Sequence, residues 1–217
     1  MQTTAALVDD HPIFREGLKL LFELHGYPHV VGEASTANDA YELVSATHPD
    51  VVVLDLVFPE GANGITVAQE ILQRNPSQRI LFLSMVKDAA QVAGALEAGA
   101  LGYVTKDQTA EDLLDAVRAV AAGKQYLGST LQSEKVDEHR RLLRTEPKLG
   151  QLASLTIRER QVFDLTIAGL TARDVGDKLS ISARTVETHR ARILRKLGAH
   201  SAADLVRLAA RAGLLNT

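Results

Sequence analysis

Val51-Val52-Val53-Leu54-Asp55 is the stretch that decides the fold. Four consecutive apolar residues, three of them β-branched, end at a single carboxylate. An apolar run of this length is typical of a strand buried on both faces, as in the middle of a parallel sheet. The carboxyl ends of such strands open onto the ligand crevice, which is where Asp55 is expected. A lone Asp at this position more often caps the next turn, so the assignment of a function depends on the other strand ends.

Composition limits the classes of protein to consider. A chain of 217 residues has room for one large domain or two small ones. It has no cysteine, which excludes disulfides, thiolate metal sites and a cysteine nucleophile, and fits a reducing compartment. The start does not resemble a signal peptide, and no apolar run approaches membrane length. We therefore expect a cytoplasmic protein that does not associate with membranes.

Acidic and basic residues are unevenly distributed, although the formal net charge is only −3. Residues 150–217 contain 11 Lys and Arg against 6 Asp and Glu, whereas residues 1–149 contain 13 against 21. A basic segment behind an acidic one indicates a nucleic-acid-binding module joined to a different domain. Solvated helix faces give similar counts, so charge alone is weak evidence.

Residues 1–122 alternate between short apolar runs and amphipathic segments. The pattern predicts strands at 5–8, 29–32, 51–54, 79–84 and 102–106, and helices at 12–22, 37–47, 65–74, 88–98 and 109–122. Five strands alternating with five helices predict an α/β fold with a doubly wound parallel sheet. In the flavodoxin-like strand order 2-1-3-4-5, strands 1 and 3 are neighbours at the switch point.

That order brings chemically active side chains to one crevice. Asp9 and Asp10 follow the first strand and join Asp55, while Ser84 and Lys106 end the adjacent strands. Three carboxylates repel one another unless a cation lies among them, and hard oxygen ligands suit Mg²⁺. A lysine and a hydroxyl can hold phosphoryl oxygens as charge develops. The pattern favours Asp55 as a nucleophile that accepts a phosphoryl group.

The same residues match a known family. Asp9-Asp10, Asp55 with Pro59 four residues later, Ser84, Tyr103 and Lys106 resemble the receiver domain of bacterial two-component response regulators. Segment 9–18, DDHPIFREGL, resembles the NarL/FixJ subfamily in particular. One departure is the position of Gly64, which comes five residues after Pro59 instead of the usual four. The extra residue in the loop Pro59–Gly64 is expected to affect access to the site or the lifetime of the phosphoryl group.

The resemblance implies a role for each residue. A sensor histidine kinase would phosphorylate Asp55, Ser84 and Lys106 would bind the phosphoryl group, and Tyr103 would be an aromatic switch that moves with Ser84. Plain packing is the alternative for Tyr103, and a solvated strand-end lysine is the alternative for Lys106. The resemblance also implies a Mg²⁺ ion held by Asp9, Asp10, Asp55 and the backbone carbonyl of Val57.

Residues 123–149 are polar and weakly periodic, which predicts a partly helical linker whose helix ends before Pro147. The pattern of residues 150–217 predicts a small all-α domain of four helices. Thr156 with Glu159 forms a capping box, Thr171 with Asp174 and Ser201 with Asp204 are its Asp variants, and Ser182 is a simpler N-cap. The tight turn Leu179–Ser182 between short helices predicts a helix-turn-helix.

The helix expected at 183–197 has a basic polar face, as a helix in a DNA major groove requires. A solvated amphipathic helix is the alternative. The pattern from Leu155 to Leu197 resembles the LuxR-type DNA-binding domain. The resemblance implies base contacts from Glu187, Thr188 and Ala191 and phosphate contacts from Arg184, Thr185, Arg192 and Lys196. His189 fits a structural role at least as well as a contact.

Two departures from that family lie in the same domain. Gly176 stands where Ala is usual, and a glycine within a helix costs about 1 kcal/mol relative to alanine. The first helix of the motif is therefore expected to be locally weak. Ala202 stands where Arg is common, which is expected to remove an anchoring interaction.

The sequence as a whole predicts a response regulator that is not an enzyme and binds double-stranded DNA. A homodimer is expected on DNA or after phosphorylation, because one short recognition helix gives little affinity alone. The first alternative is an orphan transcription regulator of the same architecture that acts without phosphorylation. The second is an aspartyl-phosphate hydrolase, which normally has Asp-x-Asp after the first strand, where this chain has Asp9-Asp10-His11.

Overall fold

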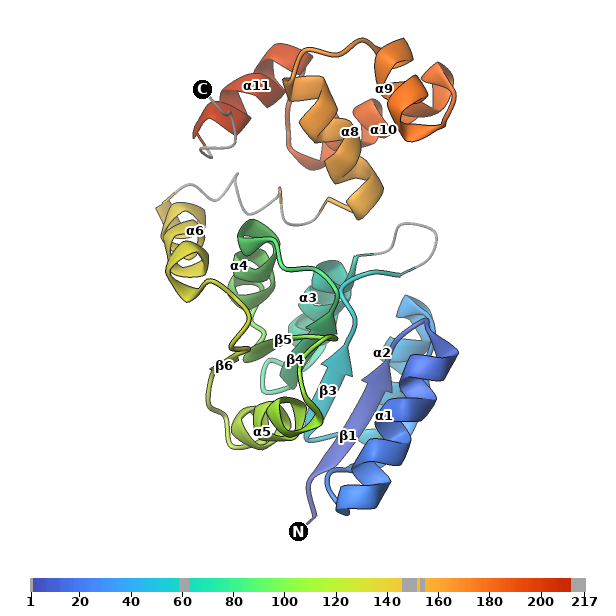
Figure 1. The fold of residues 1–217 in the computed structure, drawn as a ribbon, viewed down its shortest axis with the longest axis vertical. Coiled ribbons are helices and arrows are strands. Elements are labelled where there is room, and N and C mark those ends of the chain that lie inside the picture. Colours follow the sequence, from blue (N-terminus) through green and yellow to red (C-terminus); the bar gives the residue numbers. More distant parts are fainter. Residues whose placement is uncertain (1, 59–62, 146–151, 153–154, 212–217) are drawn as a thin grey trace. The chain divides into compact units, whose positions relative to one another are not determined.

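The computed structural model describes residues 2–58, 63–145, 152 and 155–211. The chain forms two compact units that divide between residues 140 and 141. The first unit contains a parallel sheet with helices on both faces, and the second is helical (Figure 1). These are the two architectures that the sequence predicts.

The sheet has the strand order β2-β1-β3-β4-β5-β6, and all its pairs are parallel. The first five strands follow the predicted order 2-1-3-4-5. The sixth corrects the prediction of a five-stranded sheet, because it lies within the expected linker and pairs with Gly102 and Tyr103. Two residues are too few for a strand period in the sequence. The strands are β1 (Thr4–Val8), β2 (His29–Ala34), β3 (Val51–Leu54), β4 (Arg79–Ser84), β5 (Gly102–Thr105) and β6 (Tyr126–Leu127).

Helices cover both faces of this sheet (Figure 1). Alternate strand residues such as Leu7, Val53 and Leu81 pack with apolar residues of α1 and α5. The strand residues between them face the opposite side, which α2, α3 and α4 cover, so the central strands are buried on both faces. The helices are α1 (Pro12–His25), α2 (Ala37–Thr47), α3 (Gly64–Arg74), α4 (Ala89–Glu97), α5 (Ala110–Ala121) and α6 (Ser133–Thr145).

Capping residues mark the ends of the helices in the first unit. Thr109 and Asp112 form a capping box at α5, with the Asp112 amide 3.1 Å from the Thr109 hydroxyl. Gly99 and Gly123 follow α4 and α5 with φ of 106° and 73°, in the left-handed region that favours glycine. Within the expected linker, Val136 of α6 is buried, and Arg140 binds Glu97 at 2.8 Å.

The second unit packs four helices around an apolar core that includes Val162, Phe163, Val186 and Ile193. Capping boxes Thr156–Glu159 and Thr171–Asp174 and the N-cap Ser182 are present as predicted. Ser180 ends α9 with φ of 55°, and the tight turn after it leads into α10, which completes the helix-turn-helix. The helices are α8 (Ile157–Ile167), α9 (Ala172–Leu179), α10 (Ala183–Lys196) and α11 (Ala202–Arg211).

Candidate functional site

Two carboxylates meet at the carboxyl end of the sheet. Asp9 follows β1 and Asp55 follows β3, and these strands are neighbours, with the Asp55 amide donating to the Val8 carbonyl at 2.8 Å. Asp9 is 4% exposed and Asp55 is 3% exposed. Burying two like charges side by side is unfavourable unless a cation accompanies them.

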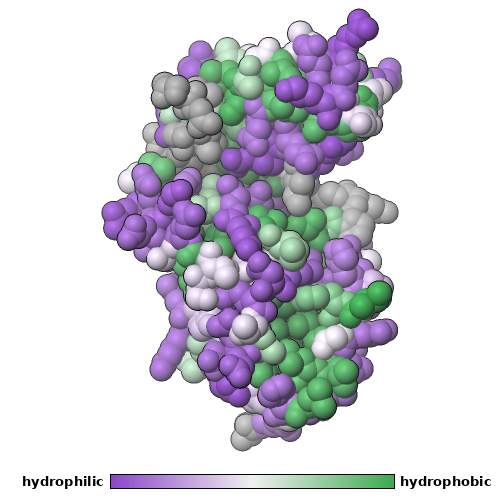
Figure 2. Space-filling view, viewed as in Figure 1, coloured by the Kyte–Doolittle hydropathy of each residue, from purple (hydrophilic) through white to green (hydrophobic). Residues whose placement is uncertain are grey.

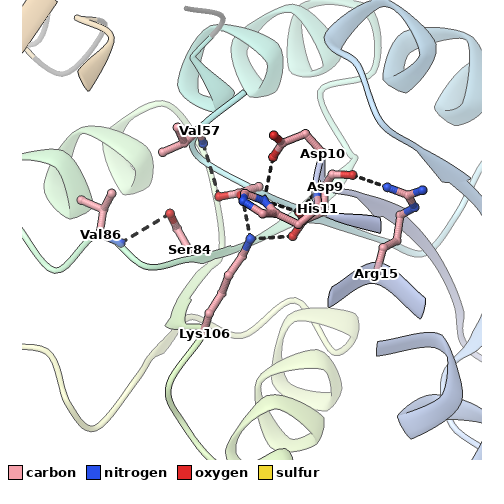
Figure 3. Close-up of polar contacts among 9 residues, drawn as sticks. Asp9, Asp10, His11, Arg15, Val57, Ser84, Val86 and Lys106 are labelled. Carbon is pink, nitrogen blue, oxygen red and sulfur yellow. Dashed lines mark hydrogen bonds and ion pairs between the residues drawn. The ribbon is translucent and has the colours of Figure 1, made fainter. Parts of the chain in front are cut away.

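Lys106 supplies that cation. Its Nζ atom lies 2.7 Å from Asp9 Oδ2 and 2.7 Å from Asp55 Oδ2 (Figure 3), and the Lys106 side chain is 7% exposed. The strand pairing fixes its place, because the Lys106 amide donates to the Ser84 carbonyl at 2.9 Å. The Phe14 ring lies 4.5 Å from the ammonium group and closes one side of the pocket.

The electrostatics of the pocket follow from these contacts. Burial raises the pKa of the Asp55 carboxyl, the hydrogen bond from Lys106 opposes that shift, and the neighbouring Asp9 charge adds to it. Burial lowers the pKa of the Lys106 ammonium, but its hydrogen bonds to Asp55 and Asp9 outweigh burial and leave the pKa raised. The Asp55 carboxylate is therefore held beside a lysine whose charged form is favoured by its two carboxylate neighbours.

Asp10 and His11 extend the cluster. His11 Nδ1 lies 2.9 Å from Asp10 Oδ1 and 3.3 Å from Asp9 Oδ1 (Figure 3). Asp10 Oδ1 is buried, and its contact with His11 lacks hydrogen-bond geometry. One ligand atom from each of Asp9, Asp10, His11 and Asp55 lies within 4.8 Å of the others. Such a group of mostly hard oxygen atoms is suited to a divalent cation.

Ser84 and Tyr103 meet at the backbone of Val86. The Val86 amide donates to Ser84 Oγ at 3.5 Å, and the Tyr103 hydroxyl donates to the Val86 carbonyl at 2.8 Å. Tyr103 is fully buried, stacks on Phe82 with ring centroids 6.0 Å apart, and has a pKa raised by burial. The packing role that the sequence left open for Tyr103 is therefore present, together with a polar link toward Ser84.

The loop after β3 approaches the pocket closely. The Val57 amide donates to Asp55 Oδ1 at 3.3 Å (Figure 3), and the Gly64 amide donates to the Leu56 carbonyl at 2.8 Å. A Cβ atom on Gly64 would lie 2.2 Å from the Asp55 carbonyl oxygen, so this position requires glycine. Residues 59–62, which carry the extra loop residue, lie outside the described part of the chain.

Several residues around the pocket carry no signal in a single sequence. Arg15 donates to the Asp9 carbonyl at 2.6 Å. Gln108 Oε1 accepts from the Thr105 amide at 3.1 Å, and its Nε2 donates to Ser129 Oγ at 3.2 Å. Gln108 thus ties the strand end next to Lys106 to the segment that leads into α6.

A hydrophobic patch lies on the surface where Figure 1 places α1 (Figure 2). Ile13, Leu20 and Leu24 are 86%, 56% and 75% exposed and repeat at helical spacing. Ile13 also lines a mostly apolar cavity of about 580 Å³ that reaches Lys106. Contiguous exposed apolar side chains of this kind mark interaction surfaces.

Helix α10 exposes every residue for which the sequence predicts a DNA contact. These residues are Arg184, Thr185, Glu187, Thr188, Ala191, Arg192 and Lys196. Glu187 binds Arg190 at 3.0 Å, and Arg190 in turn donates to the Leu170 carbonyl at 2.8 Å. Lys196 Nζ lies 2.6 Å from Glu159 Oε2, a buried carboxylate that also caps α8. Lys196 therefore has a structural partner that sequence reasoning missed.

His189, Gly176 and Ala202 also have defined environments. His189 is partly buried, Nδ1 is buried with no hydrogen-bond partner among the described residues, and burial lowers its pKa. A Cβ atom on Gly176 would lie 2.6 Å from the Ile181 carbonyl oxygen, so glycine lets the turn approach α9. Ala202 is the exposed first residue of α11.

Comparisons with known proteins agree with this geometry. A response regulator receiver domain model matches residues 5–118, and a model for bacterial regulatory proteins of the luxR family matches residues 153–209. The transcriptional regulatory protein DegU of Brevibacillus brevis is 32% identical over 92% of this chain and 89% of its own length. The oxygen regulatory protein NreC of Staphylococcus epidermidis is 32% identical over 96% of this chain and 97% of its own.

A solved structure extends the match to three dimensions. The two-component response regulator of the LuxR family from Aurantimonas sp. SI85-9A1 is 39% identical, with a TM-score of 0.60 over 65% of this chain and 99% of that one. The chain therefore belongs to the NarL/FixJ family of response regulators, in which a receiver domain precedes a LuxR-type DNA-binding domain. These are transcription regulators, and phosphorylation by a histidine kinase is typical of them. Among the described residues, the helices are too short or too polar to cross a bilayer.

Proposed function

We propose that this response regulator accepts a phosphoryl group on Asp55 from its sensor histidine kinase and changes transcription in response. The observation that carries the proposal is the Asp9–Lys106–Asp55 arrangement, with both lysine–carboxylate distances at 2.7 Å in a buried pocket. It holds an ionised carboxylate beside a cation that phosphoryl oxygens would meet. In this proposal residues 1–122 are the receiver, 123–149 the linker and 150–217 the DNA-binding domain.

In the proposed transfer, an Asp55 carboxylate oxygen forms a bond to phosphorus while the bond from phosphorus to the donor imidazole nitrogen breaks. The donor histidine leaves with the electron pair of that bond. The raised pKa of Asp55, which burial causes, makes the attacking oxygen more basic. The Lys106 ammonium and the Ser84 hydroxyl then bind the phosphoryl oxygens.

The pocket also fits Mg²⁺. Asp9, Asp10 and Asp55 offer hard oxygen atoms, and the contact of the buried Asp10 Oδ1 with His11 lacks hydrogen-bond geometry. We assign these three carboxylates and the backbone carbonyl of Val57 as the protein ligands. When bound, Mg²⁺ neutralises charge on the transferring phosphoryl group.

Tyr103 and Ser84 are the proposed switch. Ser84 Oγ accepts a hydrogen bond from the Val86 amide, and the Tyr103 hydroxyl donates one to the Val86 carbonyl. A movement of either side chain therefore affects the backbone of Val86. When Ser84 turns toward the phosphoryl group, Val86 loses one of its two side-chain contacts and the β4–α4 loop shifts. The surface around this loop then differs between the two states of the receiver.

The proposed output is DNA binding by α10. Glu187, Thr188 and Ala191 face base edges, and Arg184, Thr185, Arg192 and Lys196 contact phosphates; all seven are exposed. A homodimer on a two-fold site supplies the second recognition helix that tight binding requires. Leu205, Leu208 and Ala209 of α11 are buried in the core of the second unit, so they are not available as a dimer face.

The exposed apolar patch of α1 is the proposed docking surface for the kinase. It adjoins the cavity that leads to Lys106, so a helix seated there would bring its phosphohistidine to the pocket. Leu20→Glu is expected to slow phosphorylation by a sensor kinase at least about fivefold and to leave the rate with acetyl phosphate unchanged. Equal slowing with both donors would place the defect in the pocket and contradict this assignment.

We place the protein in the cytoplasm, where its proposed partners, DNA and the catalytic part of a kinase, are found. It is a regulator and not an enzyme, because the phosphoryl group ends on its own side chain and leaves only by slow hydrolysis.

Intact mass after incubation with acetyl phosphate and Mg²⁺ tests the acceptor proposal. Wild type should gain one phosphate, and neither Asp55→Asn nor wild type with excess chelator should gain any. A folded wild type that gains none under these conditions would favour the orphan regulator. Equal gain by Asp55→Asn would move the acceptor to another residue.

A further inference from the structure

We infer that His11 supplies a nitrogen ligand to the metal site, so that the pocket binds Co²⁺ and related transition-metal ions more tightly than Mg²⁺. The inference rests on the proposed cation site among the carboxylates and adds a residue that determines which cation is bound.

The backbone fixes His11 at the edge of the pocket. His11 is the N-cap of α1, with its carbonyl accepting from the Arg15 amide at 3.0 Å and its amide donating to Asp9 Oδ1 at 2.8 Å. Its side chain makes no capping hydrogen bond. The imidazole instead faces Asp9 and Asp10, as Figure 3 shows.

The spacing of the atoms matches a coordination sphere. Adjacent ligands of an octahedral ion with bonds of about 2.1 Å lie about 3 Å apart. His11 Nδ1 lies 2.9 Å from Asp10 Oδ1 and 3.3 Å from Asp9 Oδ1, and the ligand atoms of the cluster, with Asp55 included, all lie within 4.8 Å of one another. Opposite ligands of such an ion lie about 4.2 Å apart, so a small movement of the side chains would let a single ion contact the imidazole and the carboxylates together. Asp10 Oδ1, whose contact with His11 lacks hydrogen-bond geometry, belongs to the same group of atoms.

The chemistry of the imidazole ligand decides the selectivity. Mg²⁺ prefers oxygen ligands and gains little from an imidazole, whereas first-row transition metals gain affinity from nitrogen along the series from Mn²⁺ to Cu²⁺. Adding one imidazole to the three carboxylates and the Val57 carbonyl therefore favours Co²⁺ over Mg²⁺. The His11 side chain is 65% exposed and can accommodate the small movement that coordination requires.

A different role for His11 makes the opposite prediction. A protonated imidazole at these distances would act as a cation that occupies the metal position and pairs with Asp9 and Asp10. Removing it would then strengthen binding of every divalent cation, Mg²⁺ included. The two roles are therefore separated by the sign of the effect as well as by its selectivity.

Calorimetric titration of the full chain with Mg²⁺ and with Co²⁺ tests the inference, in a mildly alkaline buffer where imidazole is a neutral ligand. His11→Ala should weaken Co²⁺ binding about tenfold or more and change Mg²⁺ binding by less than about threefold. His29→Ala is the matched control, because His29 is an exposed histidine at the other end of the sheet, and it should behave as wild type. Asp10→Asn should weaken both ions.

Proton spectra of the Co²⁺-loaded protein give a readout that a merely structural role would not change. Wild type and His29→Ala should show hyperfine-shifted ring protons from one coordinated histidine, and His11→Ala should lack them. Unchanged Co²⁺ affinity in His11→Ala, or tighter binding of both ions, would overturn the inference and leave the Mg²⁺ proposal standing. Failure of wild type to bind either ion, or unchanged binding in Asp10→Asn, would overturn the cation site itself.

Discussion

Two lysines hold buried carboxylates in this protein, and they do so in opposite settings. Lys106 is 7% exposed and lies between Asp9 and Asp55 at the end of a parallel sheet. Lys196 is 36% exposed, lies on the last turn of a surface helix and pairs with Glu159. The Lys106 ammonium is enclosed together with its two carboxylates, whereas the Lys196 ammonium can also contact a ligand in solvent.

The different exposure of Lys106 and Lys196 determines what each lysine–carboxylate pair can do. An enclosed cation between two carboxylates balances their charge and, in the proposed function, is in place before a phosphoryl group arrives. A cation at the surface gains less from its partner because water screens it, and DNA phosphates compete for it. In the proposed function, the Lys106 pairs therefore serve phosphoryl transfer, whereas Lys196 serves both folding and DNA recognition.

The largest effect on stability should come from Lys106→Met. Asp9 and Asp55 would remain buried side by side with no cation, and removing one partner of a buried ion pair typically costs about 3–5 kcal/mol. Hydrogen exchange of the β1 and β3 amides in Mg²⁺-free buffer measures the loss within the receiver. Asp55→Asn is the control, because Lys106 keeps its ion pair with Asp9. This substitution should change the free energy of unfolding by less than about 1 kcal/mol. Equal protection of these amides in Lys106→Met and wild type would show that Lys106 does not stabilise the buried carboxylates.

Lys196→Ala should have a smaller effect, in the other domain. Glu159 would lose its ammonium partner but keep its capping bond from the Thr156 amide, at 2.9 Å. We expect a loss of about 1–2 kcal/mol, read from hydrogen exchange in α8. Binding to random-sequence duplex DNA should weaken as well, with a salt slope lower by about 1.

Arg192→Ala separates the two roles of Lys196. Arg192 is an exposed residue of the same helix, so its removal should change stability by less than about 0.5 kcal/mol and still reduce the salt slope by about 1. Fluorescence anisotropy of a labelled duplex at several salt concentrations measures the slope. A loss of preference at one base pair, with the slope unchanged, would show that Arg192 reads a base and contacts no phosphate.

The smallest effect concerns a carboxylate at the surface. Asp204 accepts hydrogen bonds from the His200 amide at 2.9 Å and Ser201 Oγ at 3.0 Å and pairs with Arg207, which lowers its pKa to about 2. Because this pKa lies below the ordinary value of about 3.9, the contribution is present above pH 4 and is lost as pH falls from about 4 to 2. Asp204→Asn should flatten the fall in melting temperature over that range, and an unchanged pH profile would contradict the assignment.

Much of the fold could be predicted because its signals lie within short segments of the sequence. The run Val51–Leu54 has no polar face, and Thr109, Thr156 and Thr171 begin helices by bonds that span only three residues. β6 could not be predicted, because two residues at a sheet edge depend on pairing with β5 rather than on their own pattern. The Gly176 contact likewise depends on the approach of a turn that sequence alone does not place.

The candidate site likewise has features that the sequence predicts and features that it does not. Asp9, Asp55, Ser84 and Lys106 could be placed together because each ends a strand and parallel strands end at one edge. The Lys196–Glu159 pair joins residues 37 apart on two helices, and nothing in the spacing of a single sequence marks it. Gln108 and Val86 act through backbone contacts that leave no pattern of residue types.

The most direct measurement locates the phosphoryl group by chemistry. An acyl phosphate on aspartate is reduced by borohydride to homoserine, which peptide mass spectrometry can assign to a single position. After treatment with acetyl phosphate and Mg²⁺, the proposed function predicts homoserine at position 55 only. Homoserine at position 9 or 10, or a phosphoryl group that resists borohydride, would contradict the claim that the buried Asp55 is the acceptor.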